Sequence, residues 1–370
     1  MRLIPDAADY LPLLVIAFAV AAALALVITP LVRRIAIRRG YVDQPNHRRV
    51  NRDPIPRGGG VAVAMSFLLV AVGWIVVNDR TGLVPVPRSI DSWELAGLLL
   101  GGAVATILGI LDDTFQLRAR WQLAGQVLLA LLAVVAGITV NSINNPFGPG
   151  NISLIGPYAV GFTVLWVVGM INSINFIDGL DGLSSGIALI AAATLGLITL
   201  TFTVAQPFVG VLCFALAGSL LGFLRWNFHP ASIFIGTSGV MFVGYTLAVL
   251  SILGTAKVAV MLLVLGVPII DTFWIIVRRL ATGRSPFTPD RGHIHHRLLD
   301  LGLSHSQTVL VIYGLCVALA VMTFVLSGTD QLYAFMGLGV LFGIGLFLLT
   351  RFETADALEA DTYEEPPPAA

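Results

Sequence analysis

The stretch "LPLLVIAFAVAAALALVITPLV", Leu11 to Val32, decides the fold class of this sequence. It carries no charged residue and is long enough to cross the hydrocarbon core of a bilayer, which takes about 20 residues of α-helix. A cleaved signal peptide has a shorter apolar core that follows its basic residues, whereas here the basic residues come after the run. We therefore expect a retained transmembrane helix.

The composition of the whole chain extends this interpretation. Of 370 residues, 57% are hydrophobic and 11% are charged, and the mean hydropathy is +0.90. Soluble domains carry about 25% charged residues, so an ordinary soluble protein is excluded. The two cysteines, Cys213 and Cys316, lie in separate apolar runs without the spacing of metal ligands. We therefore expect neither a disulfide framework nor a cysteine-based zinc site.

Apolar runs bounded by polar or turn residues predict eleven membrane helices. They are Leu11–Val32, Gly59–Val77, Leu95–Leu111, Leu123–Val140, Pro157–Ile174, Gly186–Phe202, Phe208–Leu224, Val240–Leu253, Val258–Val277, Val309–Leu326 and Tyr333–Leu349. We expect an all-α, polytopic membrane protein with one transmembrane domain over residues 1–350. Residues 351–370 are acidic and rich in proline, which predicts a disordered tail.

The basic residues predict how the chain is oriented. Alternating sides through eleven spans places most of the 21 basic residues in one set of loops. The positive-inside rule makes that side cytoplasmic, with the N-terminus outside and the C-terminus in the cytoplasm. Four polar segments fall on this side: the pair Asp112-Asp113, "MINSINFIDGLDGLSSG" (170–186), "RWNFHP" (225–230) and "DRGHIHHRL" (290–298). Charged side chains are costly at the centre of a membrane helix, so ionisable groups at the membrane edge usually have a task, and their convergence predicts a single functional site.

The segment at 170–186 spaces Asn172, Asn175, Asp178 and Asp181 three residues apart. On a helix this spacing puts neighbours on successive turns, so that Asn175 and Asp178 can serve one ligand. The glycines after each aspartate predict that the helix ends there and frees backbone N–H groups for an anion. A polar helix cap is the alternative, although four such residues exceed what a cap needs.

Two shorter segments are ambiguous. The adjacent carboxylates of Asp112 and Asp113 resist ionising together unless a cation or an arginine lies near. A solvated helix end, with Arg118 and Arg120 as partners, explains them equally well. The segment "PIPRGGG" (54–60) predicts a close backbone approach, either at a helix start or around a phosphate.

The segment "RGHIHHRL" places three histidines between two arginines, Arg291 and Arg297. Histidine clusters can bind zinc, but no cysteine or nearby carboxylate completes such a site here. The flanking arginines favour contact with a phosphate or nucleotide. A merely solvated loop is the remaining alternative.

In their order along the chain, these segments resemble the polyprenyl-phosphate N-acetylhexosamine-1-phosphate transferases. The resemblance rests on "DQPNHRRVNRDPIPRGGG", on "DD" followed by "LAGQ", and on "NSINFIDGLDGL", "WNFHPASIFIG" and "HIHHRL", from about Asp43 to Arg297. Eleven spans and an HIHH motif are similar to the branch that starts lipopolysaccharide, teichoic-acid and other surface-glycan lipids. The branch that transfers phospho-MurNAc-pentapeptide usually shows three consecutive histidines and ten spans, and it is an alternative.

The resemblance implies that undecaprenyl or another polyprenyl phosphate attacks the β-phosphorus of a UDP-N-acetylhexosamine, with UDP-GlcNAc favoured, and releases UMP at the cytoplasmic face of the plasma membrane. Such chemistry usually employs Mg²⁺, with Mn²⁺ as an alternative. The implied partners are this nucleotide sugar and the membrane lipid, without nucleic acid; a homodimer is left open. The implied metal ligands are Asp178, Asn175 and Asp181, and the implied catalytic residues are Asp112, Asp113 and Asp178. The implied substrate-binding residues are Asn172, Asn227, Arg57, Arg291, His293, His295, His296 and Arg297, with Asp43, Asp271 and Thr237 as further candidates.

Three residues depart from the family pattern. Thr237, in "GTSGV", stands where the family normally has a metal-binding aspartate, Asn51 where it often has histidine, and Gln122 where it commonly has lysine. Because threonine is a neutral and weaker ligand, we expect a lower affinity for Mg²⁺ and a greater dependence on Asp178. The alternatives are therefore an active transferase, a non-catalytic relative that binds the lipid phosphate or nucleotide, and a transporter. The charges gather at one face and no internal repeat stands out, which opposes a transporter.

Overall fold

The computed structural model describes residues 7–43, 54–145, 147–148, 150–201, 206–254, 258–281, 283, 293–326, 329–341 and 343–344. The expectations for Asn51, for Arg291 and for the tail at 351–370 lie outside the described residues. Of the last expected span, the part beyond residue 344 lies outside them as well.

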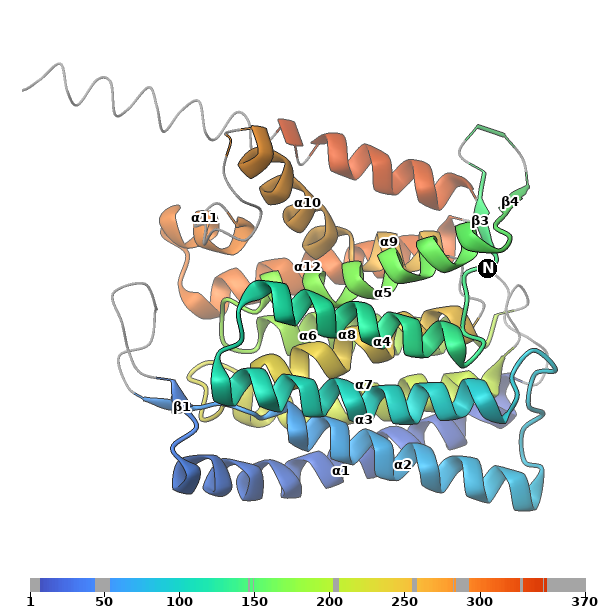
Figure 1. Cartoon of the computed structure of the whole chain (residues 1–370), viewed down its shortest axis with the longest axis horizontal. Coiled ribbons are helices and arrows are strands. Elements are labelled where there is room, and N and C mark those ends of the chain that lie inside the picture. The colour runs from blue at the N-terminus through green and yellow to red at the C-terminus, as the bar shows by residue number, and fades with distance from the viewer. Residues whose placement is uncertain are drawn as a thin grey trace, which may run out of the picture.

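Helices make up most of the structure (Figure 1). They are α1 (Ala7–Arg39), α2 (Gly60–Thr81), α3 (Ser92–Phe115), α4 (Ala119–Val135), α5 (Pro157–Ile177), α6 (Leu183–Ile198), α7 (Pro207–Asn227), α8 (Gly236–Leu253), α9 (Val258–Val264), α10 (Gly266–Ala281), α11 (Ile294–Asp300) and α12 (His305–Val325). Residues 329–341 are also helical. Two short antiparallel ribbons, which the sequence did not predict, pair β1 (Val42–Asp43) with β2 (Ile55–Pro56) and β3 (Ser142–Asn144) with β4 (Asn151–Ser153).

Within the described residues, seven helices are long and apolar enough to cross a bilayer: α1, α2, α3, α5, α7, α8 and α12. The helices α4 and α6 are apolar but shorter. The chain is therefore a mostly helical, multi-pass membrane protein, as expected. The number of eleven spans and the orientation of the termini stay predictions.

The expectation of one continuous helix over Val258–Val277 is wrong. The chain breaks at Leu265, between α9 and α10, and α10 leaves the common direction of the bundle obliquely (Figure 1). Pro268 explains the break, because it has no N–H to donate to the carbonyl of Val264 and its ring would clash with that carbonyl. In the first turn of a new helix, where α10 places it, proline is tolerated.

The core of the bundle is formed around α7 and α8, which are the most enclosed of the long helices. The helix α1 packs against α7, while α3 and α5 pack against α8. The helices α2 and α8 approach so closely that a Cβ atom added at Gly60 would lie 2.0 Å from the Cα atom of Gly239. Such glycine contacts permit close helix packing in lipid, where apolar surface alone gives little drive to associate.

The two ends of the bundle differ. Figure 1 shows β1 and α11 at one end and the β3–β4 ribbon at the other. At the first end, the start of α2 and the end of α3 both bond to the segment that opens α8. The polar segments singled out in the sequence therefore meet at one end of the bundle.

Candidate active site

The loop at residues 178–182 connects α5 to α6 and carries the aspartates of the DG-x-DG motif. Asp178 caps α5, and Gly182 adopts a φ of +78°, a left-handed conformation that glycine takes at no steric cost. The carboxylate of Asp178 accepts a hydrogen bond from the Ser184 hydroxyl at 2.5 Å. The expected helix break is confirmed, and the loop folds back onto the first turn of α6.

The charge environment identifies Asp178 as the most perturbed carboxyl of this loop. The pKa of Asp178 is raised to about 6, mainly by burial, with the negative charges of Asp113 and Asp181 acting in the same direction. The hydrogen bond from Ser184 and the charge of Arg57 act in the opposite direction. Asp113, Asp181 and Arg57, all singled out as site candidates in the sequence, thus lie close enough to influence the charge of Asp178. A cation bound here would favour the ionised form of Asp178.

Asp113, in the last turn of α3, is bound to the N-terminus of α8. Its Oδ1 atom lies 2.8 Å from the backbone N of Thr237, and its Oδ2 atom lies 3.0 Å from the backbone N of Ser238. A carboxylate at this position satisfies free N–H groups and interacts favourably with the helix dipole. Asp113 therefore stabilises the start of α8, close to Asp178.

Asp112 has different partners. Its Oδ1 atom accepts hydrogen bonds from the Leu117 backbone N at 3.0 Å and from Gln122 Nε2 at 2.8 Å. Within the described residues these donors, and not Arg118 or Arg120, satisfy the carboxylate. Gln122, which stands where the family commonly has lysine, thus gives Asp112 a neutral donor in place of a charged one.

The segment "PIPRGGG" is a helix start that packs against the chain before α8. The backbone N of Gly59 donates to the carbonyl of Phe234, and that of Gly60 to the carbonyl of Ile235, at 2.9 and 2.8 Å. Arg57 lies 2.7 Å from the carboxylate of Asp43 across the β1–β2 ribbon. The expected close backbone approach is confirmed, and its partner is protein.

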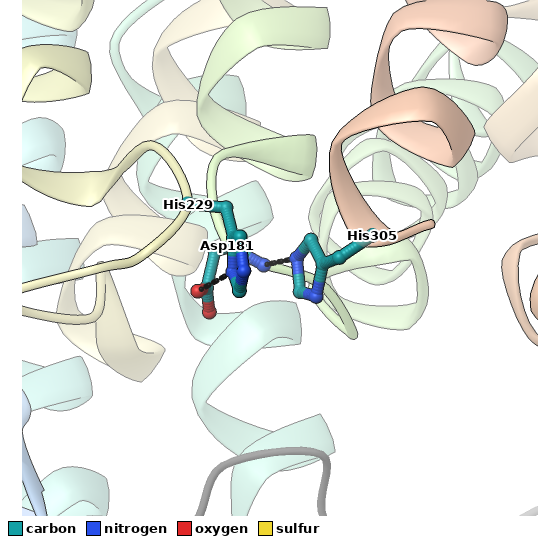
Figure 2. A group of neighbouring side chains, drawn as sticks. All are labelled: Asp181, His229 and His305. Atoms are coloured by element: carbon teal, nitrogen blue, oxygen red, sulfur yellow. Dashed lines mark hydrogen bonds and ion pairs between the residues drawn. The ribbon is translucent and has the colours of Figure 1, made fainter. Parts of the chain in front are cut away.

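Asp181 ties the loop to two other segments (Figure 2). Its Oδ2 atom lies 2.8 Å from His229 Nδ1 and 3.1 Å from the backbone N of Ala231. Its own backbone N donates to His305 Nε2 at 2.9 Å, at the first turn of α12. The loop that carries Asp178 is therefore held from two sides.

Asp181, His229 and His305 also form a donor set with ligand atoms within 4.8 Å of one another. Two imidazoles and a carboxylate suit a transition metal. However, the two rings are stacked, with centroids 4.1 Å apart and planes inclined by 16°. Since each nitrogen lone pair lies in its ring plane, one ion cannot lie in both planes in this arrangement. The observed hydrogen bonds of Asp181 with His229 and His305 hold the loop in place. The metal role of Asp181 stays a prediction.

The histidine motif forms the short helix α11 against the same loop. His295 is 1% exposed, and a Cβ atom added at Gly179 would lie 2.2 Å from its Nε2 atom. Burial lowers the pKa of His295 well below its ordinary value, and the neighbouring His296, His293 and His305 add to this effect. His295 is therefore a neutral packing contact of the DG-x-DG loop. Arg297, two residues on, is buried.

Two of the predicted asparagines form hydrogen bonds within the protein. Asn172 Nδ2 donates to Gln126 Oε1 at 2.6 Å and so links α5 to α4. The buried Asn227 accepts from the Ser185 hydroxyl at 2.6 Å and donates to the carbonyl of Ile233 at 3.1 Å. These contacts position α4, α6 and the segment before α8, and the predicted substrate contacts of both asparagines remain predictions.

A cavity of about 820 Å³ opens beside this site, between α4, α5, α9 and α10. Most of its lining is apolar, and its polar lining residues are Gln122, Gln126, Asn172, Asn175, Arg279 and His293, with Ser173 and Thr272. An apolar space with polar groups of this kind suits a ligand that has a long hydrocarbon part and a charged head.

Sequence reasoning missed several residues of the site. Ser184 stood in the quoted segment at 170–186, where its bond to Asp178 was not visible, and His305 lies outside every motif, where a single histidine gives no signal. His229 stood in the quoted "RWNFHP" segment, where its proximity to Asp181 was not visible. Tyr313 donates a hydrogen bond to the carbonyl of Gly182 from the third turn of α12, at a distance of 131 residues along the chain.

Comparison with known proteins identifies the family of this chain. Residues 95–255 match the model of glycosyl transferase family 4. The chain is 36% identical over 306 residues to a probable undecaprenyl-phosphate N-acetylglucosaminyl 1-phosphate transferase of Bacillus subtilis (strain 168), covering 81% of each chain. The chain belongs to glycosyl transferase family 4.

Further members of glycosyl transferase family 4 are similar over most of their length. A decaprenyl-phosphate N-acetylglucosaminephosphotransferase of Mycobacterium tuberculosis is 32% identical, over 76% of this chain and 74% of the relative. An undecaprenyl-phosphate alpha-N-acetylglucosaminyl 1-phosphate transferase of Yersinia pestis is 29% identical, over 76% and 75%. The family resemblance of the sequence motifs is confirmed.

Proposed function

We propose that this chain transfers an N-acetylhexosamine 1-phosphate, with GlcNAc 1-phosphate as the first candidate, from a UDP-sugar to polyprenyl phosphate. An oxygen of the lipid phosphate forms a bond to the β-phosphorus of the UDP-sugar, and the bond from that phosphorus to the bridging oxygen breaks, so that UMP leaves. The observation that carries the proposal is the grouping of Asp178, Asp113 and Arg57 at one end of the bundle, next to a largely apolar cavity. The named activities of the relatives support it.

The donor set around Asp178 fits a divalent cation such as Mg²⁺. Its carboxylate is half-buried, accepts one short hydrogen bond from Ser184, and has a raised pKa. Asn175 lies one turn earlier and lines the cavity, so its amide oxygen supplies a second hard ligand. When bound, such an ion neutralises the charge of the diphosphate and of the phosphoryl group in transfer.

The chain's own residues provide positioning. Arg57, held by Asp43, offers a positive charge close to Asp178. Asp113 fixes the start of α8 against α3, and the hydrogen bonds of Asp181 with His229 and His305 fix the loop at residues 178–182. The cavity receives the hydrocarbon chain of the acceptor, with Arg279 as a cation among its lining residues.

The membrane arrangement that we propose has eleven spans, the N-terminus outside, and the site at the cytoplasmic face of the plasma membrane. Each of the eleven expected apolar runs contains helical residues, which supports the number. The concentration of arginine in loops on the side of the site supports the orientation.

The test is an assay of purified full-length protein with radiolabelled UDP-GlcNAc, undecaprenyl phosphate or decaprenyl phosphate, and a series of Mg²⁺ and Mn²⁺ concentrations. We expect a lipid-soluble labelled product and an equal amount of UMP. Asp178→Asn should remove the activity, and Asp300→Asn, an exposed change in α11, should preserve it. Absence of turnover with every UDP-N-acetylhexosamine would overturn the proposal.

A non-catalytic family member that binds the lipid phosphate or the nucleotide is the second candidate. It is favoured by Thr237, which puts a neutral side chain where the family normally has a metal-binding aspartate. Binding of UDP-GlcNAc without turnover would support it.

A further inference from the structure

The buried acid of α10, Asp271, faces the start of α11. Its Oδ2 atom lies 2.7 Å from His293 Nδ1, and its Oδ1 atom accepts a hydrogen bond from the backbone N of Ile294 at 2.9 Å. Asp271 is 1% exposed. Because an ionised carboxylate only accepts hydrogen bonds, the imidazole proton at this contact must lie on Nδ1 of His293.

Besides Asp271, the His293 ring has the cavity and two aromatic rings as neighbours. His293 lines the cavity, whereas Asp271 does not. The ring is stacked on His295, with centroids 5.5 Å apart, and its centroid lies 6.0 Å from that of Phe176. With Nδ1 turned to Asp271 and the ring plane held by these neighbours, the ring edge left for the cavity carries Nε2.

We propose that Asp271 is a positioning residue that holds the His293 ring with its proton on Nδ1 and so makes Nε2 a hydrogen-bond acceptor in the cavity. The group that it accepts from is an uncharged hydroxyl or N–H group of the UDP-sugar, so this inference rests on the proposed function. An acceptor lone pair disfavours phosphate oxygens, and the cation that lines the cavity is Arg279. His293 thus selects a donor group and does not bind phosphate.

The substitution Asp271→Asn reverses this arrangement with little change in shape. The N–H of Ile294 still requires an acceptor, so the amide oxygen takes that side and the amide NH₂ faces His293 Nδ1. The nitrogen must then accept, which moves the ring proton to Nε2. The cavity is left with a donor in place of an acceptor, the kind of tautomer error that disables histidines oriented by a carboxylate.

The tautomer is measured directly on full-length protein labelled with ¹⁵N-histidine, by the shifts of the two ring nitrogens, with His293→Gln identifying the signals. We expect protonated Nδ1 and unprotonated Nε2 in the wild type, and the reverse in Asp271→Asn. A wild-type ring protonated on Nε2, or a ring unchanged in Asp271→Asn, overturns the proposal. This readout needs no ligand and no activity.

Calorimetric binding then tests the acceptor. We expect Asp271→Asn and His293→Ala each to weaken UDP-GlcNAc binding about tenfold, and the double variant to be no weaker, because both remove one hydrogen bond. The control Asp300→Asn should bind like the wild type. A loss shared by UDP assigns the donor group to the nucleotide, and a loss seen with UDP-GlcNAc but not with UDP or UDP-glucose assigns it to the acetamido N–H.

Two results separate the inference from the proposed function. Unchanged UDP-GlcNAc binding in a variant with a reversed tautomer, or additive losses in the double variant, overturns the acceptor role. A wild-type protein that binds no UDP-sugar overturns the proposed function, and the acceptor role with it, while the positioning of His293 by Asp271 is still decided by the ¹⁵N shifts.

Discussion

Asp113 and Thr237 are joined at the start of α8, where the carboxylate Oδ1 lies 2.8 Å from the Thr237 backbone N. Thr237, at the position where the family normally has a carboxylate, is thus bound through its backbone by the carboxylate of Asp113 from α3. Since both oxygens of Asp113 accept backbone hydrogen bonds, the negative charge of Asp113 serves the helix as well as the site. Under the proposed function, Asp178 is then the carboxyl on which binding of the cation would most depend.

Replacing Thr237 by aspartate should strengthen Mg²⁺ binding at the proposed site, because it adds a charged oxygen ligand where this chain has a neutral one. We expect the Mg²⁺ concentration for half-maximal activity to fall about tenfold, with a small change in kcat. Thr237→Asn is the control, because asparagine has the size of aspartate but no charge. It should change the Mg²⁺ concentration for half-maximal activity little. Activity that appears only in Thr237→Asp would instead establish the wild type as the non-catalytic relative.

Activity at limiting Mg²⁺ should decline as the pH falls through about 6, the raised pKa of Asp178. Below this pH the carboxyl holds a proton and cannot bind a cation; above it the carboxylate is free to do so. Because the ion and the proton compete, additional Mg²⁺ should move the midpoint to lower pH. A midpoint that is independent of Mg²⁺ concentration would assign the transition to another group.

Gly60→Ala should destabilise the fold, because the new Cβ atom would lie 2.0 Å from the backbone of Gly239. Overpacking of this kind typically costs about 1–3 kcal/mol of unfolding free energy. The matched control is Gly73→Ala in the same helix, where an added Cβ meets nothing within 4 Å. Thermal unfolding in detergent measures both, and equal midpoints would refute the close contact of α2 with α8.

His305→Ala should loosen the loop that carries Asp178, since the Asp181 N–H loses its acceptor. One hydrogen bond is worth about 1 kcal/mol, so we expect the apparent Mg²⁺ affinity to fall about fivefold. Tyr313→Phe, which removes the donor to the Gly182 carbonyl, should act similarly. Ser306→Ala, on the same turn of α12 as His305, is the control. An unchanged Mg²⁺ dependence in both test variants would contradict the bracing role.

Much of this architecture follows from local sequence. The apolar runs, the helix break after Ile177 and the close approach of "PRGGG" were all predicted, because each depends on residues adjacent in the chain. The capping of α8 by Asp113 and the contact of His305 with Asp181 join residues 124 apart, and no local pattern encodes them. The break at Leu265 was overlooked because hydropathy counts Pro268 as part of an apolar run, although its missing N–H ends the preceding helix.

The contact between Gly60 and Gly239 limits which substitutions the interface between α2 and α8 can accept. Where two backbones touch, there is no side chain to exchange, so the relative placement of α2 and α8 cannot be tuned by substitution without forcing the helices apart. Asp113 bonds to the start of α8 beside this contact, and Arg57 acts on the charge of Asp113, so the placement of both depends on how α2 and α8 pack. Under the proposed function, altered substrate preference is therefore expected to arise from side chains on the walls of the cavity, such as those of Leu165, Ile276 and Phe273.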